Sequence, residues 1–360
     1  MKDMERLSEV PYIGKKRESI LNDNGIFTVE ELKKIDFYTL ANLPSFGYVP
    51  AYRIKAMITD VVMRYKGMKE IKEDKMDGPL VIGDKKINTR KEIERLQPED
   101  FELEDTTTWS FEERGDWATH DPSFRGNWSP KVARNLILRY SQEGDTVLDP
   151  MVGGGTTSVE CLLTGRNGIG VDINVRSAML TKNRIAFPEE HLKGLPASTQ
   201  RVFTGDSRNL DLIENESIDL IATHPPYANI IPYGKEAMEG DLSAIPSYDI
   251  FAEEMRKAAK EFYRVLKPGK YCGILIGDTH KRCHYVPIAY KVMQQFLREG
   301  FILKEDVIKA QWNCDSTPMW KNSDNKFLLT MHEHLFVFRK PSEQENLRDY
   351  QNSMSSFVEG

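Results

Sequence analysis

From about residue 106 to residue 340, short apolar runs alternate along the chain with longer amphipathic stretches. The runs read TVLDP, GIGVDI, RVFTGD, IDLIATHPPY, YCGILIGD, FILKEDVIK and HLFVFRK. Short runs rich in Val, Ile, Leu and Phe predict buried strands, and the stretches between them are long enough for crossover helices. Such alternation is typical of a mostly parallel sheet with helices on its faces, so the pattern predicts an α/β fold.

Residues 1–66 have a different pattern, with no strand-like runs. Two similar segments, VPYIGKKRESIL and LPSFGYVPAYRIKAMI, each place a Pro and a short turn before a stretch of helical periodicity. The turns contain Ile13-Gly14 and Phe46-Gly47. We therefore predict a small all-α N-terminal domain built from an internal repeat.

Two further segments carry little periodicity. Residues 67–105 are rich in Lys, Glu and Asp and predict a charged linker, whereas residues 341–360 predict a polar tail. No apolar run approaches the roughly 18–20 residues of a membrane span, and the first residues lack the apolar stretch of a secretory signal. The four cysteines are scattered. These features predict a cytoplasmic chain with no membrane partner.

The net charge of the chain does not show whether it binds nucleic acid. The formal net charge is −6 and the isoelectric point is near 5.8, yet phosphate contacts need only a local basic face. Metal binding is not expected, because the spacing of Cys272, His280, Cys283 and His284 fits no common zinc pattern.

The segment from Gly144 to Asn174 predicts a strand, a glycine-rich turn, a helix and a second strand. Glycines 153–155 (Gly153, Gly154 and Gly155) let the backbone approach a ligand without interference from a Cβ atom. Thr156 and Thr157 stand where the helix begins, so we expect them to cap it and to present backbone N–H groups. Asp172 lies about 20 residues beyond the turn, where a carboxylate reaches ribose hydroxyls. A glycine-rich turn alone also fits NAD, FAD or no ligand.

The full string DPMVGGGTT, which begins at Asp149 and Pro150, resembles the DPFxGSGTT cofactor motif of the DNA amino-methyltransferases. The resemblance implies S-adenosyl-L-methionine as cofactor and a Rossmann-like class I methyltransferase fold with a mostly parallel seven-stranded sheet. It also implies two further contacts. Asn127, Trp128 and Ser129 would hold the methionine end of the cofactor, and Asp206 would contact the adenine ring.

The loop Thr223-His224-Pro225-Pro226-Tyr227 resembles the (D/N/S)PPY signature of enzymes that methylate a planar NH2 group. Such an amine is a poor nucleophile, and acceptors that hold its hydrogens pull the nitrogen toward a geometry that can attack. The prolines would aim a carbonyl at the amine, and Tyr227 would stack on a flipped base. His224 departs from the signature, but a neutral imidazole also accepts a hydrogen bond and could take up the released proton.

The sequence argues against one methyl acceptor but does not decide among the others. No Pro-Cys pair occurs in the chain, so carbon-5 methylation of cytosine, which needs a thiolate, is not expected. The non-acidic residue at position 224 slightly favours cytosine N4 over adenine N6. An RNA base, a protein glutamine and a catalytically silent DNA-binding subunit stay open as alternatives.

The N-terminal repeat resembles a tandem helix-hairpin-helix module, which implies a grip on the DNA backbone. Lys15, Lys16 and Arg17 follow the first turn and would meet phosphate. Tyr12 and Ser45 replace the first glycine of the usual turn, and a protein–protein module is the alternative interpretation.

Base recognition would come from short insertions. The candidates are the loop Ala228–Tyr248 and the segment Lys309–Phe327, in which Trp312, Trp320 and Lys321 combine stacking surface with positive charge. The expected partners are therefore DNA and, in a restriction–modification system, a cognate restriction endonuclease.

Overall fold

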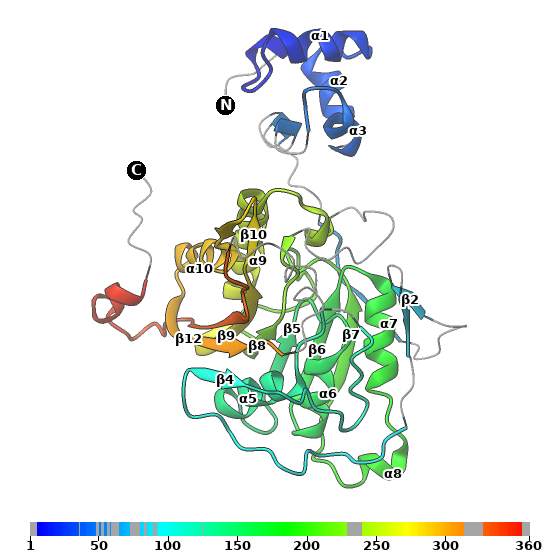
Figure 1. Ribbon diagram of the computed structural model, residues 1–360, viewed down its shortest axis with the longest axis vertical. Helices are drawn as coiled ribbons and strands as arrows, with labels where there is room; N and C mark the ends of the chain where they lie inside the picture. Colours follow the sequence, from blue (N-terminus) through cyan, green and yellow to red (C-terminus); the bar gives the residue numbers. More distant parts are fainter. Residues whose placement is uncertain are drawn as a thin grey trace. The chain divides into compact units, whose positions relative to one another are not determined.

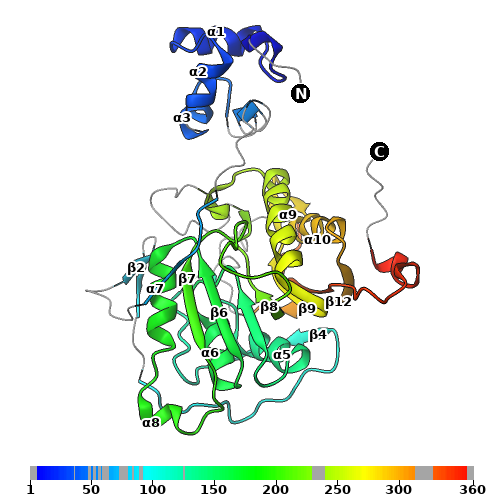
Figure 2. The same ribbon diagram turned by 180° about the vertical axis from the view of Figure 1, so that it is seen from behind.

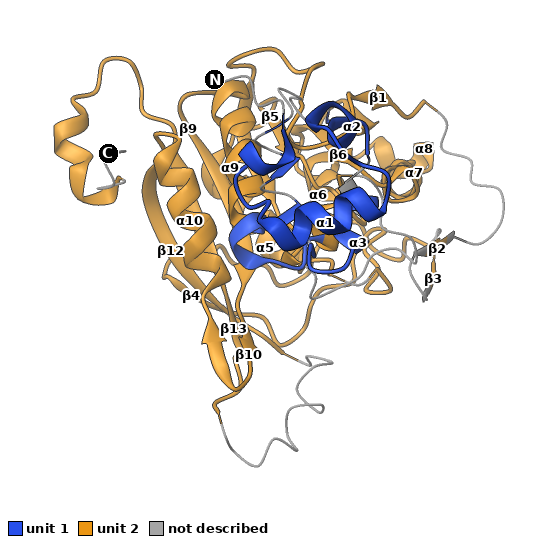
Figure 3. Ribbon diagram, turned by 90° about the horizontal axis from the view of Figure 1, so that it is seen from above, with its two compact units in different colours: residues 1–65, 245–251 blue, residues 66–244, 252–360 orange. Residues whose placement is uncertain are grey.

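The computed structural model describes residues 6–35, 37–47, 50–51, 54–55, 58, 65–72, 80–82, 85–88, 92–124, 126–228, 240–312 and 327–354. The chain divides into two compact units, shown in separate colours in Figure 3. One unit consists of residues 1–65 with 245–251, and the other consists of residues 66–244 with 252–360.

The larger unit is built on one sheet with the strand order β1-β7-β6-β5-β8-β9-β13-β12-β4 (Figure 1). Its strands are β1 (Lys69–Glu70), β4 (Thr108–Ser110), β5 (Thr146–Asp149), β6 (Asn167–Asp172), β7 (Gln200–Thr204), β8 (Ile218–Thr223), β9 (Leu266–Gly277), β12 (Ile302–Ala310) and β13 (His332–Arg339). Neighbouring strands are parallel, except that β13 is antiparallel to β9 and β12 and β1 is antiparallel to β7. The seven predicted apolar runs supply the seven central strands, so the predicted Rossmann-like fold is confirmed, with two short edge strands added.

Helices cover both faces of this sheet (Figure 2). They are α5 (Pro130–Tyr140), α6 (Thr156–Leu163), α7 (Val175–Arg184), α8 (Glu189–Leu192), α9 (Tyr248–Val265) and α10 (Ile288–Arg298). Strand β13 shows why two layers form. Leu335 and Val337 pack in the core that contains α5, whereas Phe338 stacks on Phe296 of α10 with ring centroids 4.9 Å apart. Because successive strand side chains point to opposite faces, α5 and α10 lie on opposite sides of the sheet.

Two small hairpins complete this unit. They are β2 (Leu80–Ile82) with β3 (Lys85–Ile87), and β10 (Thr279–Lys281) with β11 (His284–Val286). The region predicted as a linker therefore contains β1, β2 and β3. The region predicted as a tail contains the 3-10 helix η4 (Leu347–Ser353). Among the described residues, no helix is long and apolar enough to cross a membrane.

The smaller unit has its own apolar core, as an independent domain requires. The elements whose bounds the structure describes are the 3-10 helix η1 (Leu7–Glu9), α1 (Lys15–Asp23), α2 (Val29–Lys34) and α3 (Phe37–Asn42). The two predicted turns share one unusual backbone position, since Tyr12 and Ser45 adopt φ of 71° and 67°, which residues other than glycine seldom adopt. The turns differ at their glycines, because φ is −83° at Gly14 and 65° at Gly47.

Candidate active site

The glycine-rich turn and the Pro-Pro loop lie next to each other because their strands are neighbours. β5 pairs in parallel with β8, so their carboxyl ends meet at one edge of the sheet. Asp149, at the end of β5, accepts hydrogen bonds from the Thr223 hydroxyl at 2.7 Å and from the Met151 N–H at 3.1 Å. Burial raises the pKa of Asp149 to about 6. Its carboxyl therefore joins the two loops internally.

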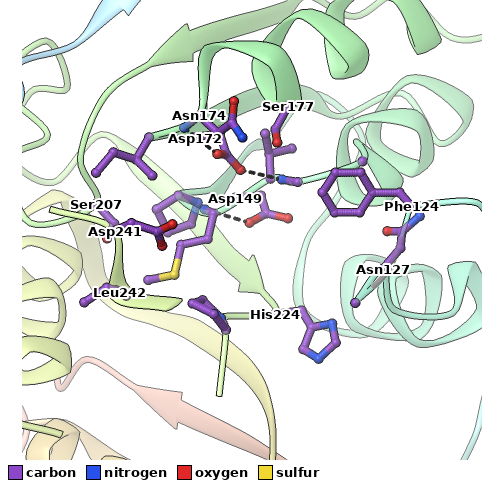
Figure 4. Close-up of a pocket in the computed structure, with 18 of the residues that line it drawn as sticks. Phe124, Asn127, Asp149, Asp172, Asn174, Ser177, Ser207, His224, Asp241 and Leu242 are labelled. Atoms are coloured by element: carbon purple, nitrogen blue, oxygen red, sulfur yellow. Dashed lines mark hydrogen bonds between the residues drawn. The ribbon is translucent and has the colours of Figure 1, made fainter. Parts of the chain in front are cut away.

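A pocket opens at this edge and encloses about 800 Å³, including open solvent at its mouth. In the view of Figure 4, Phe124 and Asn127 lie at one end of the pocket and Asp241 and Leu242 at the other. His224 faces the same space. One cavity is therefore shared by the turn and the loop.

The structure places most of the predicted cofactor residues in the wall of this pocket. Those that line it are Asn127, Trp128, Asp149, Pro150, Gly153, Gly154, Asp172 and Asp206. Those behind the wall are Ser129, Gly155, Thr156 and Thr157. Of the loop predicted to be catalytic, His224 and Pro226 line the pocket, whereas Pro225 and Tyr227 do not.

The prediction that Thr156 and Thr157 cap the following helix is wrong. The N-cap of α6 is Gly155, and no side chain caps it. The Thr156 hydroxyl donates to Asn127 Oδ1, and the Thr157 hydroxyl donates to Asp149. These threonines thus fix two pocket side chains from behind, which spacing along the sequence could not reveal.

Asp172 lines the pocket at the end of β6. Its carboxylate accepts from the Gly153 N–H at 2.9 Å and from the Asn174 N–H at 2.8 Å. Burial raises the pKa of this carboxyl to about 7. In its ionised form it still has acceptor capacity for a ligand hydroxyl, because a carboxylate offers about four lone-pair sites.

The raised pKa predicts a pH-dependent stability for Asp172→Asn. An unfolded Asp titrates near 3.9, so the folded chain holds this proton more tightly. The resulting stabilisation is full below about pH 4 and is lost as the pH rises through about 7. We expect the melting temperature of the cofactor-free wild type to fall more than that of the variant between about pH 5 and about pH 8. We also expect weaker cofactor binding by the variant.

Differential scanning fluorimetry at the two pH values, with calorimetry for the cofactor, measures both effects. Asp100→Asn alters an exposed aspartate outside the pocket and should follow the wild type. Melting temperatures of Asp172→Asn that move in parallel with those of the wild type would contradict the assignment.

Asp206 is buried and already paired. Both of its oxygens accept from the guanidinium of Arg208, at 2.8 Å and 2.6 Å. Arg208 also donates to Glu254 and to the carbonyl of Gly240. The predicted adenine contact of Asp206 would therefore use a carboxylate that this ion pair holds in place.

One end of the pocket carries an unsatisfied donor. Asn127 Oδ1 accepts from Thr156, while its Nδ2 is buried and has no hydrogen-bond partner among the described residues. A buried polar group without a partner is costly, and Asn127 lines the pocket. An acceptor on a bound ligand, such as the carboxylate of an amino acid, would satisfy it. The apolar lining residues Met151, Ile173 and Leu242 suit a flat ring. The residues present thus fit an amino acid joined to a nucleoside.

The imidazole of His224 lies between two aromatic side chains. Its ring stacks on Trp128, with centroids 6.0 Å apart, and its Nε2 lies 2.5 Å from the Tyr227 hydroxyl. Within the described part of the chain, its Nδ1 is buried and has no hydrogen bond of good geometry, although the backbone of Gly126 lies close enough to the ring to raise its pKa. Burial lowers the pKa of His224 to about 4, so the ring is neutral at physiological pH.

Tyr227 makes two contacts within the protein that were not predicted. Its hydroxyl donates to Glu333 on β13 at 2.6 Å, and its ring packs against Gly277, where an added Cβ would lie 2.8 Å from Tyr227 Cε2. Its stacking on a base stays a prediction. Glu333 was missed by the sequence analysis, because more than 100 residues separate it from the loop that it contacts.

The residues predicted to bind nucleic acid differ in exposure and in their hydrogen-bond partners. Lys15 and Lys16 are exposed, whereas the Arg17 guanidinium donates to the carbonyls of Ser45 at 2.9 Å and Tyr12 at 2.7 Å. Arg17 therefore ties the two turns of the smaller unit together. Trp312 is exposed, and its indole N–H donates to the Ser110 hydroxyl.

Trp320 and Lys321 lie outside the described residues. Residues 229–239 of the predicted recognition loop Ala228–Tyr248 also lie outside the described residues, so its role in recognition stays a prediction. Of its described residues, Gly240, Asp241 and Leu242 line the pocket.

The hairpin β10–β11 was not predicted from the sequence. It follows β9 directly, and Lys281, Arg282 and His284 are exposed on it. Its two turn residues, Arg282 and Cys283, adopt φ of 52° and 65°, as in a type I′ turn. No group of three His, Cys, Asp or Glu side chains within the described ranges is placed to hold a metal ion.

The strand order and the pocket at the carboxyl ends of β5, β6 and β8 define a Rossmann-like methyltransferase domain. The chain belongs to the DNA methylase family of N6/N4 methyltransferases, which it matches over residues 50–183 and 218–357. This membership makes S-adenosyl-L-methionine the cofactor, in agreement with the chemistry of the pocket wall.

Similar proteins include DNA and RNA enzymes. The chain is 23% identical over 264 residues to the Type II methyltransferase M.MjaII of Methanocaldococcus jannaschii, covering 72% of this chain and 46% of that protein. It is 34% identical over 105 residues to the tRNA (guanine(10)-N2)-dimethyltransferase of Methanothermobacter thermautotrophicus, covering 29% of each chain. A solved methyltransferase from Methanosarcina mazei is 16% identical, with a TM-score of 0.40 over 57% of this chain and 97% of that one. The chain spans about half the length of the first curated relatives that it matches.

Proposed function

We propose that the protein transfers a methyl group from S-adenosyl-L-methionine to the exocyclic amino group of a base in DNA. The observation that carries this proposal is the shared pocket, in which His224 and Pro226 lie in one wall with Gly153 and Gly154. Membership of the DNA methylase family supports DNA as the substrate.

The residues present suggest how the cofactor would be held. Asn127 would donate to the carboxylate of its methionine end, Asp172 would accept from its ribose hydroxyls, and Ile173 and Leu242 would contact its ring. The cofactor supplies an electrophilic methyl group. In the transfer the sulfonium S–CH3 bond breaks, an N–CH3 bond forms, and the amine loses one proton.

The loop would prepare the amine. A neutral His224 can accept a hydrogen bond from one amine hydrogen at Nδ1. A backbone carbonyl of the loop that follows Thr223 can accept from the other. Two acceptors pull the nitrogen lone pair out of conjugation, which makes the nitrogen a better nucleophile. The same Nδ1 can take the proton that the methylated amine releases. No covalent bond to the enzyme is needed.

The identity of the methylated base is a second part of the proposal. We favour cytosine N4 over adenine N6, because an imidazole stands where an acidic residue mostly accompanies adenine in the enzymes that the loop resembles. The tRNA methyltransferase named above acts, by its name, on guanine N2, so an RNA base is the second candidate.

Two features outside the pocket support a polyanionic substrate despite the acidic composition. The hairpin β10–β11 presents Lys281, Arg282 and His284, and it begins two residues beyond Gly277, which contacts Tyr227. In the smaller unit, Lys15 and Lys16 are exposed at the start of α1. We propose that both groups contact phosphates. A cognate restriction endonuclease is the partner that a Type II system would add.

The experiment is transfer of a radiolabelled methyl group to duplex DNA and, separately, to tRNA. Modification-sensitive sequencing of DNA from cells that express the chain then reports site and base together. Label in DNA on cytosine N4 supports the full proposal, and label on adenine N6 corrects the base. Label in tRNA alone would overturn DNA as the substrate, and no transfer with intact cofactor binding would favour a silent subunit.

A further inference from the structure

We propose that Glu333, acting through Tyr227, is a positioning residue that sets the tautomer of His224 and so makes Nδ1 the hydrogen-bond acceptor for the substrate amine. This inference rests on the proposed function for its catalytic consequence. The tautomer itself is a property of the protein alone.

The three side chains form a buried row of hydrogen bonds. His224 Nε2 lies 2.5 Å from the Tyr227 oxygen, which lies 2.6 Å from Glu333 Oε1. The other Glu333 oxygen accepts from Lys309 Nζ at 2.9 Å. Glu333 and Lys309 are only 8% and 15% exposed, so water does not easily replace these contacts.

The sheet explains why these residues meet. Glu333 is the register partner of Gly277 on β9 and of Lys309 on β12. The lysine places a cation beside the carboxylate. The glycine leaves the space that the Tyr227 ring occupies, since a Cβ there would lie 2.8 Å from the ring.

The direction of the hydrogen bonds follows from counting protons. Burial acts to raise the pKa of Glu333, but Lys309 and the Tyr227 hydroxyl oppose it, and that pKa lies below its usual value. Glu333 is therefore ionised and can only accept. The Tyr227 hydroxyl has one hydrogen and gives it to Glu333, so its oxygen must accept from His224 Nε2–H.

A neutral imidazole carries one N–H, so Nδ1 must then carry the lone pair. Within the described residues, Nδ1 is buried and has no hydrogen bond of good geometry, on a residue that lines the pocket. The Gly126 backbone, which lies near the ring and raises the pKa of His224, would favour the opposite tautomer, so the hydrogen bond to Tyr227 must outweigh it. The opposite tautomer would present an N–H to the amine hydrogens and would repel them. Glu333 thus plays the part that a carboxylate plays when it holds a catalytic histidine in one tautomer, here with a tyrosine in between.

Glu333→Gln should reverse the direction of the hydrogen bonds that join residue 333, Tyr227 and His224. Lys309 would take the amide oxygen, the amide NH2 would donate to the tyrosine oxygen, and the tyrosine would donate to Nε2. His224 would then carry its hydrogen on Nδ1. We expect kcat to fall roughly 10–100-fold, with the dissociation constant of the cofactor unchanged within about threefold.

The decisive readout is the tautomer, measured without substrate by 15N NMR of histidine-labelled protein, with His224→Asn identifying the resonance. We expect Nε2–H in the wild type and a shift toward Nδ1–H in Glu333→Gln. Tyr227→Phe leaves the Glu333–Lys309 pair in place and should give a mixture of tautomers, so the test survives if Glu333→Gln does not fold. Glu345→Gln removes an ion-paired carboxylate that bonds Arg339, the last residue of β13, and should change neither tautomer nor kcat.

Nδ1–H in the wild type, or Nε2–H retained in both variants, would overturn the inference even if methyl transfer is observed. Conversely, the expected tautomers without methyl transfer to any nucleic acid would overturn the proposed function alone. In the His224→Asn background Glu333→Gln should cost little more, because the histidine through which it acts is gone.

Discussion

Replacing His224 by alanine is expected to lower kcat roughly 10²–10³-fold, the loss usual for one preorganised hydrogen-bonding group at a reacting centre. The cofactor should still bind within a few-fold of the wild type, because the glycine turn and Asp172 do not depend on the imidazole. The measurement is a single-turnover methyl-transfer assay, with calorimetry for the cofactor.

His224→Asn separates the acceptor from the ring. Asparagine stands at this place in the NPPY form of the loop and offers a carbonyl oxygen as acceptor, so we expect it to keep kcat within about tenfold of the wild type. His191 lies on α8, outside the pocket wall, and His191→Ala is the matched control. Equal activity of His224→Ala and the wild type would remove the imidazole from the chemistry.

The pH profile gives the same prediction a second test. Burial and, to a smaller extent, Lys309 and Arg114 lower the pKa of His224, and Glu333 and the Gly126 backbone oppose them, with a result of about 4. An unfolded histidine titrates near 6.5. The neutral ring therefore persists well below pH 6.5, and its contribution to stability is lost as the pH falls toward about 4. If His224 titrated near pH 6.5, the pH profile of the wild-type kcat would have an inflection there that His224→Asn lacks. We expect no such inflection.

The sequence predicted what depends on local pattern. Seven apolar runs became the seven central strands. The clearest is β8, which is buried at every position, as expected for a parallel strand covered on both faces. The pocket also followed from pattern, since turns after parallel strands gather at one edge of the sheet. Glycines 153 and 154, Asp172 and His224 were found in this way.

Side-chain partners were not predictable, because they come from strands distant in sequence. The side chains of Thr156 and Thr157 bond to Asn127 and Asp149 rather than capping α6. Arg17 bonds two backbone carbonyls of its own unit. Glu333 meets Tyr227 only because β13 inserts between β9 and β12, an arrangement that no local spacing reveals.

Gly155→Val is expected to weaken cofactor binding at least roughly 100-fold, an effect of about 2.7 kcal/mol. Gly155 has φ of 84°, where a β-branched residue is strained by about 1–3 kcal/mol. A Cβ would also lie 3.1 Å from the Thr181 Cα, which is backbone and cannot turn aside. The turn must therefore move, and Gly153 and Gly154 move with it.

Gly194→Val is the matched control, because a Cβ at Gly194 meets nothing within 4 Å and its backbone needs no positive φ. Calorimetry with S-adenosyl-L-methionine and far-ultraviolet circular dichroism separate lost binding from lost folding. If Gly155→Val does not fold, Gly155→Ala keeps the strain with a smaller side chain and should show a graded loss. Wild-type affinity in a folded Gly155→Val would mean that the turn does not seat the cofactor, and the assignment of His224 to a shared reaction centre would fail with it.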